Sequence, residues 1–304
     1  MRNTFATELL NAARLDPRIV LVSGDLGFGV FDEFRAELPQ QFVNAGVAEQ
    51  AMMSMAAGLS SQGLRPFVYS IANFPSFRCL EQIRNDVAYM KNRVTIVSVG
   101  AGMGYGAHGY SHHAIEDLAI IRIFKEIEIY SPSDQNETIY CMRKILESSA
   151  PSYLRLGKGG EVNLRETYGF QHTDRGLGIG VARMAVFWTG GIGSEVLAAV
   201  QELEQEGIKV FAMSFPEISR DLILGALDSI ANLSVLTVEE HVLEGGFGSA
   251  VLEVASDNAH TGRITRLGIN SQNKHALGSQ SFLRAINGLD ASSIAKKLRE
   301  MVEV

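Results

Sequence analysis

Residues 41–58 read QFVNAGVAEQAMMSMAAG, and this stretch decides the fold of the first half of the chain. Phe42 and Val43 are strand-like, the strand pattern breaks by Gly46, and a helical pattern follows at once. Glu49 is therefore expected in the first turn of a helix, just beyond the carboxyl end of a strand, where ligands collect in open α/β sheets. A carboxylate at this position also complements the helix dipole, which is a purely structural alternative.

Short β-branched runs alternate with longer helical patterns on both sides of this stretch. The first series has strands expected at 19–22, 66–70, 94–99, 127–130 and 153–156, and helices at 3–14, 47–61, 76–90, 114–123 and 134–148. The second series has strands at 185–188, 209–213, 234–238 and 264–267, and helices at 193–206, 219–231, 246–256 and 290–302. This alternation predicts an α/β protein with two doubly wound domains on parallel sheets.

A glycine-rich, charged segment without periodicity separates the two series. It predicts a first domain over residues 1–160, a linker over 161–182 and a second domain over 183–304. The chain has 304 residues, of which 46% are hydrophobic, and this is enough for two cores of ordinary size.

Charge and cysteine content narrow the class of protein. The formal net charge is −7 and no run of basic residues stands out, which disfavours nucleic acid and anionic membranes as partners. The apolar stretches are too short to span a bilayer, and the N-terminus lacks the apolar core of a signal peptide. Cys79 and Cys141 have no metal-binding spacing and suit a reducing compartment. We therefore expect a cytoplasmic protein.

Four stretches together resemble the C-terminal half of transketolase and its thiamine-diphosphate-dependent relatives. They are NAGVAEQ at 44–50, SIANFPSFRCLEQIRN at 70–85, GYGAHGYSHHAIEDLA at 104–119, and LTVEEH at 236–241 followed by GGFGSAV. Their order and spacing along almost the whole chain carry the resemblance, because each motif alone is weak. The resemblance implies a pyrimidine-binding domain followed by a transketolase C-terminal domain, with thiamine diphosphate as cofactor.

The resemblance assigns the catalytic and cofactor-binding residues. Glu49 matches the family glutamate that bonds the N1′ nitrogen of the aminopyrimidine ring, and it is expected to act in catalysis as well as in binding. Phe74 is expected to stack on that ring and Phe77 to line the same pocket, although aromatic residues at this spacing are often plain core. Asp25 matches a family aspartate near the cofactor, and an Asx-type turn after the first strand explains it equally well.

His112 falls on the active-site histidine of the family motif "THQ". The resemblance implies that it polarises the substrate carbonyl and moves protons. A metal site made of His108, His112 and His113 is disfavoured, because neighbouring histidines in a loop rarely converge on one ion and no acidic or thiolate ligand is near in sequence.

The substrate-binding positions depart from those of the sugar-phosphate enzymes. Arg2 matches the first phosphate ligand of the family and Lys158 replaces the last, an arginine, while Gly29 and Gly100 stand where the family has Ser and His. His108 stands in place of an aspartate that reads a sugar hydroxyl, and Tyr110 and His113 replace a proline and a glutamine. Loss of two ligands and of a bidentate arginine weakens phosphate recognition, so we expect a sugar or sugar-like acceptor with less dependence on phosphate.

The motif that holds the cofactor diphosphate through Mg²⁺ does not match this chain. Gly24-Asp25-Leu26 is not the family's Gly-Asp-Gly, and Asn44 lies too close to replace its later asparagine. We therefore expect a partner subunit that carries the diphosphate site and the Mg²⁺ ligands, with none on this chain. The expected assembly is a heterotetramer of two copies of each subunit (α2β2).

The sequence thus predicts the small subunit of a split, transketolase-like enzyme that moves a two-carbon ketol unit from a ketose to an aldehyde. One rival is the β-subunit of a 2-oxo-acid dehydrogenase, which shares the fold and cofactor but whose "HSQ" signature fits less well. Another is a regulatory subunit without catalysis, for which the pairing of Glu49 with His112 would have no use.

Overall fold

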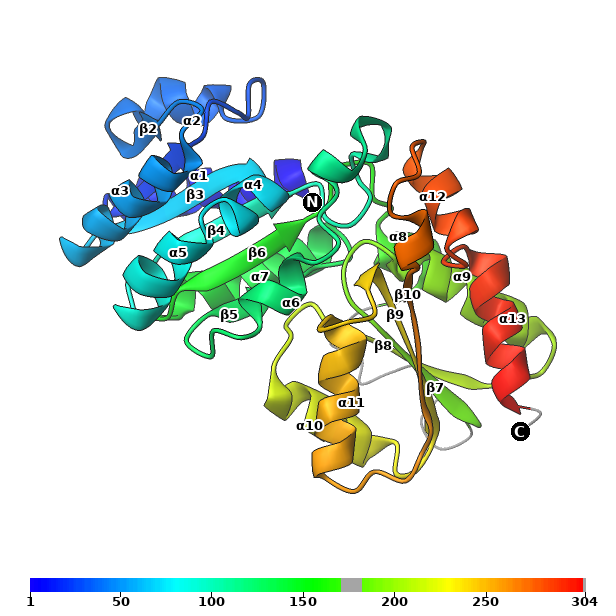
Figure 1. Ribbon diagram of the computed structural model, residues 1–304. Coiled ribbons are helices and arrows are strands. Elements are labelled where there is room, and N and C mark those ends of the chain that lie inside the picture. Colours follow the sequence, from blue (N-terminus) through cyan, green and yellow to red (C-terminus); the bar gives the residue numbers. More distant parts are fainter. Residues whose placement is uncertain (171–181, 303–304) are drawn as a thin grey trace.

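The computed structural model describes residues 1–170 and 182–302, which form two α/β halves side by side (Figure 1). Each half is built on one parallel sheet, so the predicted fold class is confirmed. The helix α8, Leu164–Tyr168, lies within the predicted linker, while residues 171–181 of that linker lie outside the described residues.

The first sheet has six parallel strands in the order β2-β1-β3-β4-β6-β5. Their bounds are β1 Ile19–Ser23, β2 Phe42–Asn44, β3 Arg65–Ile71, β4 Thr95–Val99, β5 Glu128–Tyr130 and β6 Ser152–Leu156. Successive side chains of a strand point to opposite faces. In β1, Ile19 and Leu21 enter one core, and Val20 and Val22 enter the other. A strand that is apolar at every position therefore indicates a sheet covered on both faces.

Helices from both sides supply these two cores. On one face lie α1, Arg2–Leu15, and α7, Gln135–Glu147. On the other lie α3, Glu49–Ser61, α6, Asp117–Ile121, and a π-helical segment, Ile83–Tyr89. Short helices complete this half: α2 Asp32–Glu37, α4 Asn73–Phe77 and α5 Leu80–Gln82.

The second sheet has four parallel strands in the order β10-β9-β7-β8. They are β7 Met184–Trp188, β8 Val210–Ser214, β9 Ser234–Val242 and β10 Ile264–Ile269. One face packs against α9, Gly193–Gln205, and α13, Ala291–Val302, and the other against α10, Arg220–Ser229, and α11, Phe247–Asp257. Val186 and Phe187 of β7 enter opposite cores, as the buried strand of a doubly wound sheet requires.

A buried ion pair stands where the two halves meet. Arg155 on β6 bonds Asp117 at the start of α6, with 2.8 Å between Nε and Oδ2, and both side chains are at most 2% exposed. Although burial opposes ionisation, the guanidinium of Arg155 holds the pKa of the Asp117 carboxyl below its ordinary value. The same guanidinium donates to the carbonyl oxygens of Ala114 and of Glu240 in β9. One side chain therefore ties the first sheet to both α6 and the second half.

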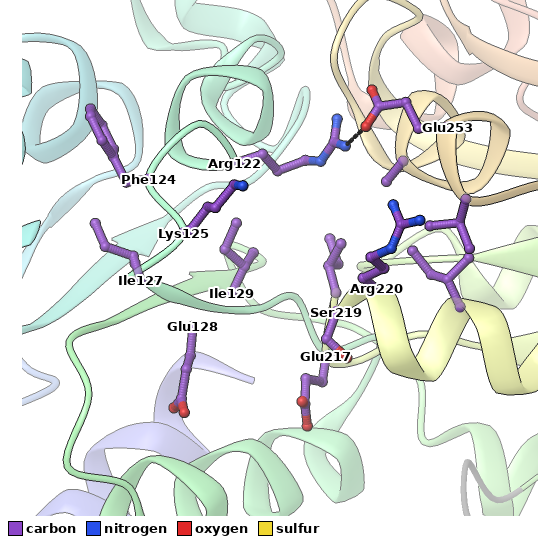
Figure 2. A pocket seen from close by; sticks show the side chains of 14 residues that line it. Arg122, Phe124, Lys125, Ile127, Glu128, Ile129, Glu217, Ser219, Arg220 and Glu253 are labelled. Carbon is purple, nitrogen blue, oxygen red and sulfur yellow. Dashed lines mark hydrogen bonds and ion pairs between the residues drawn. The ribbon is translucent and has the colours of Figure 1, made fainter. Parts of the chain in front are cut away.

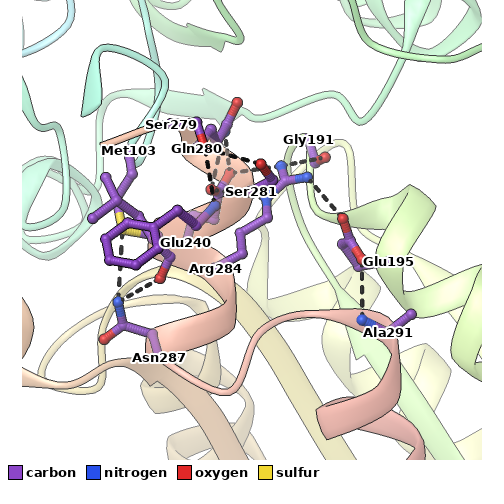
Figure 3. Close-up of polar contacts among 12 residues, drawn as sticks. Met103, Gly191, Glu195, Glu240, Ser279, Gln280, Ser281, Arg284, Asn287 and Ala291 are labelled. Carbon is purple, nitrogen blue, oxygen red and sulfur yellow. Dashed lines mark hydrogen bonds and ion pairs between the residues drawn. The ribbon is translucent and has the colours of Figure 1, made fainter. Parts of the chain in front are cut away.

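A second polar cluster surrounds the carboxylate of Glu240 (Figure 3). Arg284 of α12, Gln280–Ile286, donates to both carboxylate oxygens of Glu240 at 3.1 Å and pairs with Glu195. Gln280 donates to the same carboxylate. Glu240 lies against Gly102, where an added Cβ would stand 2.5 Å from the glutamate Cβ. This cluster therefore supports the loop that follows β4.

Two of the predicted helices differ in the structure. The pattern at 114–123 becomes α6, Asp117–Ile121, because Ala114 instead forms an antiparallel bridge with Gly102. The pattern at 76–90 splits into α4, α5 and the π-helical segment. Helix α12 was not predicted. Among the described residues, no helix is long and apolar enough to cross a membrane.

A groove between the halves has a mixed charge (Figure 2). Arg122, Lys125 and Arg220 line it together with Glu217 and Glu253, and Arg122 pairs with Glu253 at 2.7 Å. The groove contains none of the residues that the sequence analysis assigns to the cofactor or substrate.

Candidate active site

The carboxyl ends of five strands in the first sheet lead into the predicted site residues. Because all strands of this sheet run parallel, these ends lie along one edge, which is the usual place for a ligand site in an open α/β sheet. The residues that follow them are Asp25 after β1, Glu49 after β2, Phe74 and Phe77 after β3, the three histidines after β4, and Lys158 after β6.

Glu49 is the first residue of α3, as expected from the break at Gly46, whose φ of 70° suits glycine. Its side chain is only 3% exposed, and Oε2 accepts a hydrogen bond from Arg78 Nη1 at 2.7 Å. The described residues provide no donor to Oε1. A buried carboxylate with one free oxygen can accept a hydrogen bond from a ligand at this edge of the sheet.

Phe74 lies one helical turn before Arg78, in α4. The Arg78 guanidinium carbon is 4.9 Å from the centre of the Phe74 ring, in cation–π geometry. The same ring contacts the His112 imidazole edge-on, with 5.4 Å between ring centres. Phe74 therefore stands between the glutamate and the histidine, and the structure brings together the three residues that the resemblance assigns to the cofactor and to catalysis.

His112 belongs to the loop between β4 and α6. Asn73 Nδ2 at the start of α4 donates to the backbone oxygen of Ser111, and the Ser111 hydroxyl lies 3.0 Å from His112 Nδ1. Partial burial, with His108 nearby, lowers the pKa of His112 below its ordinary value. The imidazole is therefore mainly neutral at neutral pH, and in that form one ring nitrogen donates while the other accepts.

A chain of ring contacts continues from His112 toward β6. His108 lies 5.1 Å from His112 between ring centres, and Tyr105 contacts His108 edge-on at 5.8 Å. Lys158 Nζ stands 5.0 Å from the centre of the Tyr105 ring. Three of the predicted substrate residues, His108, His112 and Lys158, are thus linked through Tyr105, which the sequence analysis did not single out.

His113 is more deeply buried than His108 and His112. Its side chain is 3% exposed, whereas His108 is exposed and His112 half-buried. Burial also lowers the pKa of His113. The contact of His113 with substrate therefore remains a prediction, and it requires a ligand that reaches below the surface of the loop.

Asp25 and Phe77 lie at the edges of this arrangement. Asp25 has a φ of 58°, and its Oδ1 accepts from Asn44 Nδ2 at 2.9 Å, so it forms a polar link between the ends of β1 and β2. Phe77 ends α4 and is 38% exposed. A contact of either residue with the cofactor stays a prediction.

Arg2 and Lys158 line the same cavity, of about 460 Å³, at the start of α1. Gln135, Gly159 and Gly160 also line it. Two of the predicted substrate residues are thus brought together although they are far apart in sequence. Two cations beside a helix N-terminus favour an anionic group of a ligand.

At Gly100, the Tyr105 ring occupies the space that a side chain would need. The φ of Gly100 is 88°, and an added Cβ would stand 2.1 Å from an atom of the Tyr105 ring. A larger residue at this position would displace Tyr105 and with it the contacts to His108 and Lys158. The aromatic ring therefore stands where the resemblance expects a histidine to bind phosphate.

Arg78 is, like Tyr105, a site residue that sequence reasoning missed. The signal was present, since Arg78 follows Phe74 by four residues, the spacing of neighbours on a helix face. Among the described residues, no group of three or more His, Cys, Asp or Glu side chains is placed to hold a metal ion.

The chain is similar to known proteins of one family over both of its halves. Residues 1–160 match the family of the transketolase pyrimidine-binding domain, and residues 183–294 match that of the transketolase C-terminal domain. The chain is 33% identical to one of the subunits of apulose-4-phosphate transketolase from Phocaeicola vulgatus, over 99% of this chain and 97% of the relative. It is also 33% identical to 1-deoxy-D-xylulose-5-phosphate synthase of Heliobacterium modesticaldum, but it spans only 46% of that protein.

A solved structure described as a split gene transketolase, inactive beta4 tetramer, superposes on this chain with a TM-score of 0.83. The two are 29% identical, over 99% of this chain and 97% of the other. The two domain matches, with a relative of nearly the same length, establish that this chain belongs to the transketolase family.

Proposed function

We propose that this chain is the small subunit of a heteromeric, thiamine-diphosphate-dependent transketolase that transfers a two-carbon ketol unit from a ketose to an aldehyde acceptor. The observation that carries the proposal is the line of contacts from Glu49 through Arg78 and Phe74 to His112. It joins a buried carboxylate, an aromatic ring and a histidine at the carboxyl edge of the first sheet.

The side chains at this edge fit the aminopyrimidine part of thiamine diphosphate. Glu49 presents a buried carboxylate whose Oε1 has no donor among the described residues, and Phe74 lies beside it with an aromatic face. When bound, thiamine diphosphate supplies the carbanion chemistry of the transfer, while the protein supplies binding, orientation and electrostatics.

Each residue then has a distinct task. Glu49 Oε1 would hold the pyrimidine in register through a hydrogen bond with the ring nitrogen N1′, in which the carboxyl group and that nitrogen share one proton. Phe74 packs against the ring and excludes water from one side. His112, neutral because burial lowers its pKa, donates a hydrogen bond to the substrate carbonyl oxygen and stabilises the charge that develops there.

The partner in this proposal is a separate subunit with the diphosphate-binding domain. The relative in Phocaeicola vulgatus is described as one subunit of its transketolase, and the similar solved structure as an inactive tetramer of beta chains. Both descriptions support a chain that needs a second kind of subunit for activity. We place the Mg²⁺ ligands on that second kind of subunit and propose an α2β2 assembly.

The acceptor is proposed to be a sugar or sugar-like aldehyde that does not require a phosphate group. Tyr105 fills the space at Gly100, and Lys158 offers one point charge in place of a bidentate arginine. Arg2 and Lys158 still line one cavity, so an anionic group is accommodated there without being the main source of affinity.

The experiment that tests the proposal is two-carbon transfer by this chain, by its partner subunit and by their mixture, with matched free and phosphorylated aldoses as acceptors. We expect transfer only in the mixture, with the two acceptor series within about tenfold of each other in kcat/KM, equivalent to about 1.4 kcal/mol. Reaction of phosphorylated aldoses alone would contradict the proposed acceptor class.

The same assay separates the two rivals. Release of CO2 from a 2-oxo acid, without ketol transfer, would favour a 2-oxo-acid dehydrogenase subunit. A partner that transfers ketol units equally well without this chain would favour a regulatory subunit.

A further inference from the structure

Arg78 engages both groups that the proposed function assigns to the aminopyrimidine ring. Its Nη1 bonds Glu49 Oε2 at 2.7 Å, and its guanidinium carbon lies 4.9 Å from the centre of the Phe74 ring. The rest of the described chain offers Arg78 no other ion pair. One side chain therefore covers a carboxylate and an aromatic face that belong to different elements, α3 and α4.

The chemistry of a guanidinium resembles that of a protonated aminopyrimidine. Both groups are planar, both donate N–H hydrogen bonds to a carboxylate, and both stack on aromatic rings. From this similarity we infer that Arg78 is a placeholder for the cofactor pyrimidine: it holds Glu49 and covers Phe74 until the pyrimidine ring displaces it. The inference rests on the proposed function, because it takes thiamine diphosphate as the ligand.

The exposed fractions of Glu49 and Arg78 indicate which of these two side chains moves when the cofactor binds. Glu49 is 3% exposed and anchored in the first turn of α3, whereas Arg78 is 49% exposed. A long, half-exposed arginine can turn into solvent with its charge hydrated, but a buried carboxylate cannot follow it. Displacement therefore releases Glu49 in place, already oriented for a new donor.

The contact between Arg78 and Glu49 also stabilises the chain when no cofactor is bound. A buried carboxylate without a counter-charge is costly, and Arg78 offsets this cost while the site is open. The consequence is competition: Oε1 of Glu49 is already open to the pyrimidine ring, but the side of Phe74 that Arg78 covers becomes available only after Arg78 has left it, together with its bond to Oε2. Arg78 is thus a positioning residue that lowers cofactor affinity, not a residue that contributes to it.

The test is the affinity for thiamine diphosphate, measured by calorimetry with Mg²⁺ on the assembled complex of this chain and its partner subunit. Loss of a half-exposed ion pair and a cation–π contact predicts about tenfold tighter binding for Arg78→Met. Arg78→Lys keeps the charge without the planar face and is expected to return the affinity toward that of the wild type. Arg84→Met is the matched control, since the Arg84 guanidinium bonds the neighbouring Asn85 and is expected to leave the affinity unchanged when removed.

Unchanged or weaker binding by a folded Arg78→Met complex would overturn the inference and leave the proposed function intact. If Arg84→Met tightened the binding of thiamine diphosphate as much as Arg78→Met does, the inference would also be overturned. The effect would then come from the loss of one positive charge and not from the position of Arg78. If the wild-type complex binds no thiamine diphosphate, the proposed function fails and this inference fails with it. Thermal unfolding of each variant separates these results from misfolding.

Discussion

Replacement of Glu49 by glutamine is expected to lower the ketol-transfer rate of the assembled complex by about 10²–10⁴-fold, the range for loss of a positioned acid or base. The substitution keeps the size of the side chain and still offers an oxygen to Arg78, so α3 and its packing are retained. What it removes is the negative charge and the proton affinity of a buried group at 3% exposure. The measurement is kcat with saturating thiamine diphosphate and substrates.

The matched control is Glu81→Gln, which removes an exposed carboxylate from the nearby α5. We expect its rate to stay within about twofold of the wild type, because it lies outside the line of contacts from Glu49 to His112. A Glu49→Gln complex that assembles normally and retains more than about a tenth of the wild-type rate would show that this carboxylate is structural.

Replacement of Arg155 by methionine is expected to destabilise the chain by about 3–5 kcal/mol, the cost of breaking a fully buried ion pair from one side. Asp117 would remain buried with its charge uncompensated, while the carbonyl oxygens of Ala114 and Glu240 would lose a donor. Because Ala114 closes the histidine loop against Gly102, we also expect a loss of order around His112. Urea unfolding measures the stability.

A double variant separates the charge from the packing. In Asp117→Asn/Arg155→Met no uncompensated charge remains, and the asparagine oxygen can still accept from the Tyr153 hydroxyl. We expect this variant to recover part of the lost stability. Arg165→Met, on the exposed surface of α8, is the control and should change the free energy of unfolding by less than about 0.5 kcal/mol. A loss of under about 1 kcal/mol in the single Arg155→Met variant would contradict a stabilising role for the pair.

The sequence alone predicts the sheet architecture because the residue pattern of a strand shows whether one or both of its faces are buried. Residues 19–22 are apolar at every position, and this pattern belongs to a strand covered on both faces. The position of Glu49 follows equally from local chemistry, since the glycine at 46 ends one element and the helical run begins another. Both inferences use neighbours in sequence, where periodicity and turn chemistry apply.

What could not be predicted depends on contacts between distant segments. The bond from Arg155 to Glu240 joins residues that no local pattern connects. The same is true of Arg2 and Lys158, which line one cavity and which only the family resemblance had assigned to one site. The helix predicted at 114–123 is shorter for the same reason: the bridge of Ala114 with Gly102 is a tertiary contact that overrides helix propensity. Arg78 lies between these cases, because its spacing from Phe74 is local but its bond to Glu49 is not.

The most direct test of the split active site is calorimetric binding of thiamine diphosphate with Mg²⁺ to this chain, to its partner subunit and to their mixture. We expect tight binding in the mixture alone, because this chain supplies the pyrimidine side of the site and the partner supplies the diphosphate side. Equally tight binding by this chain by itself would contradict this expectation, since a diphosphate site would then lie within these 304 residues.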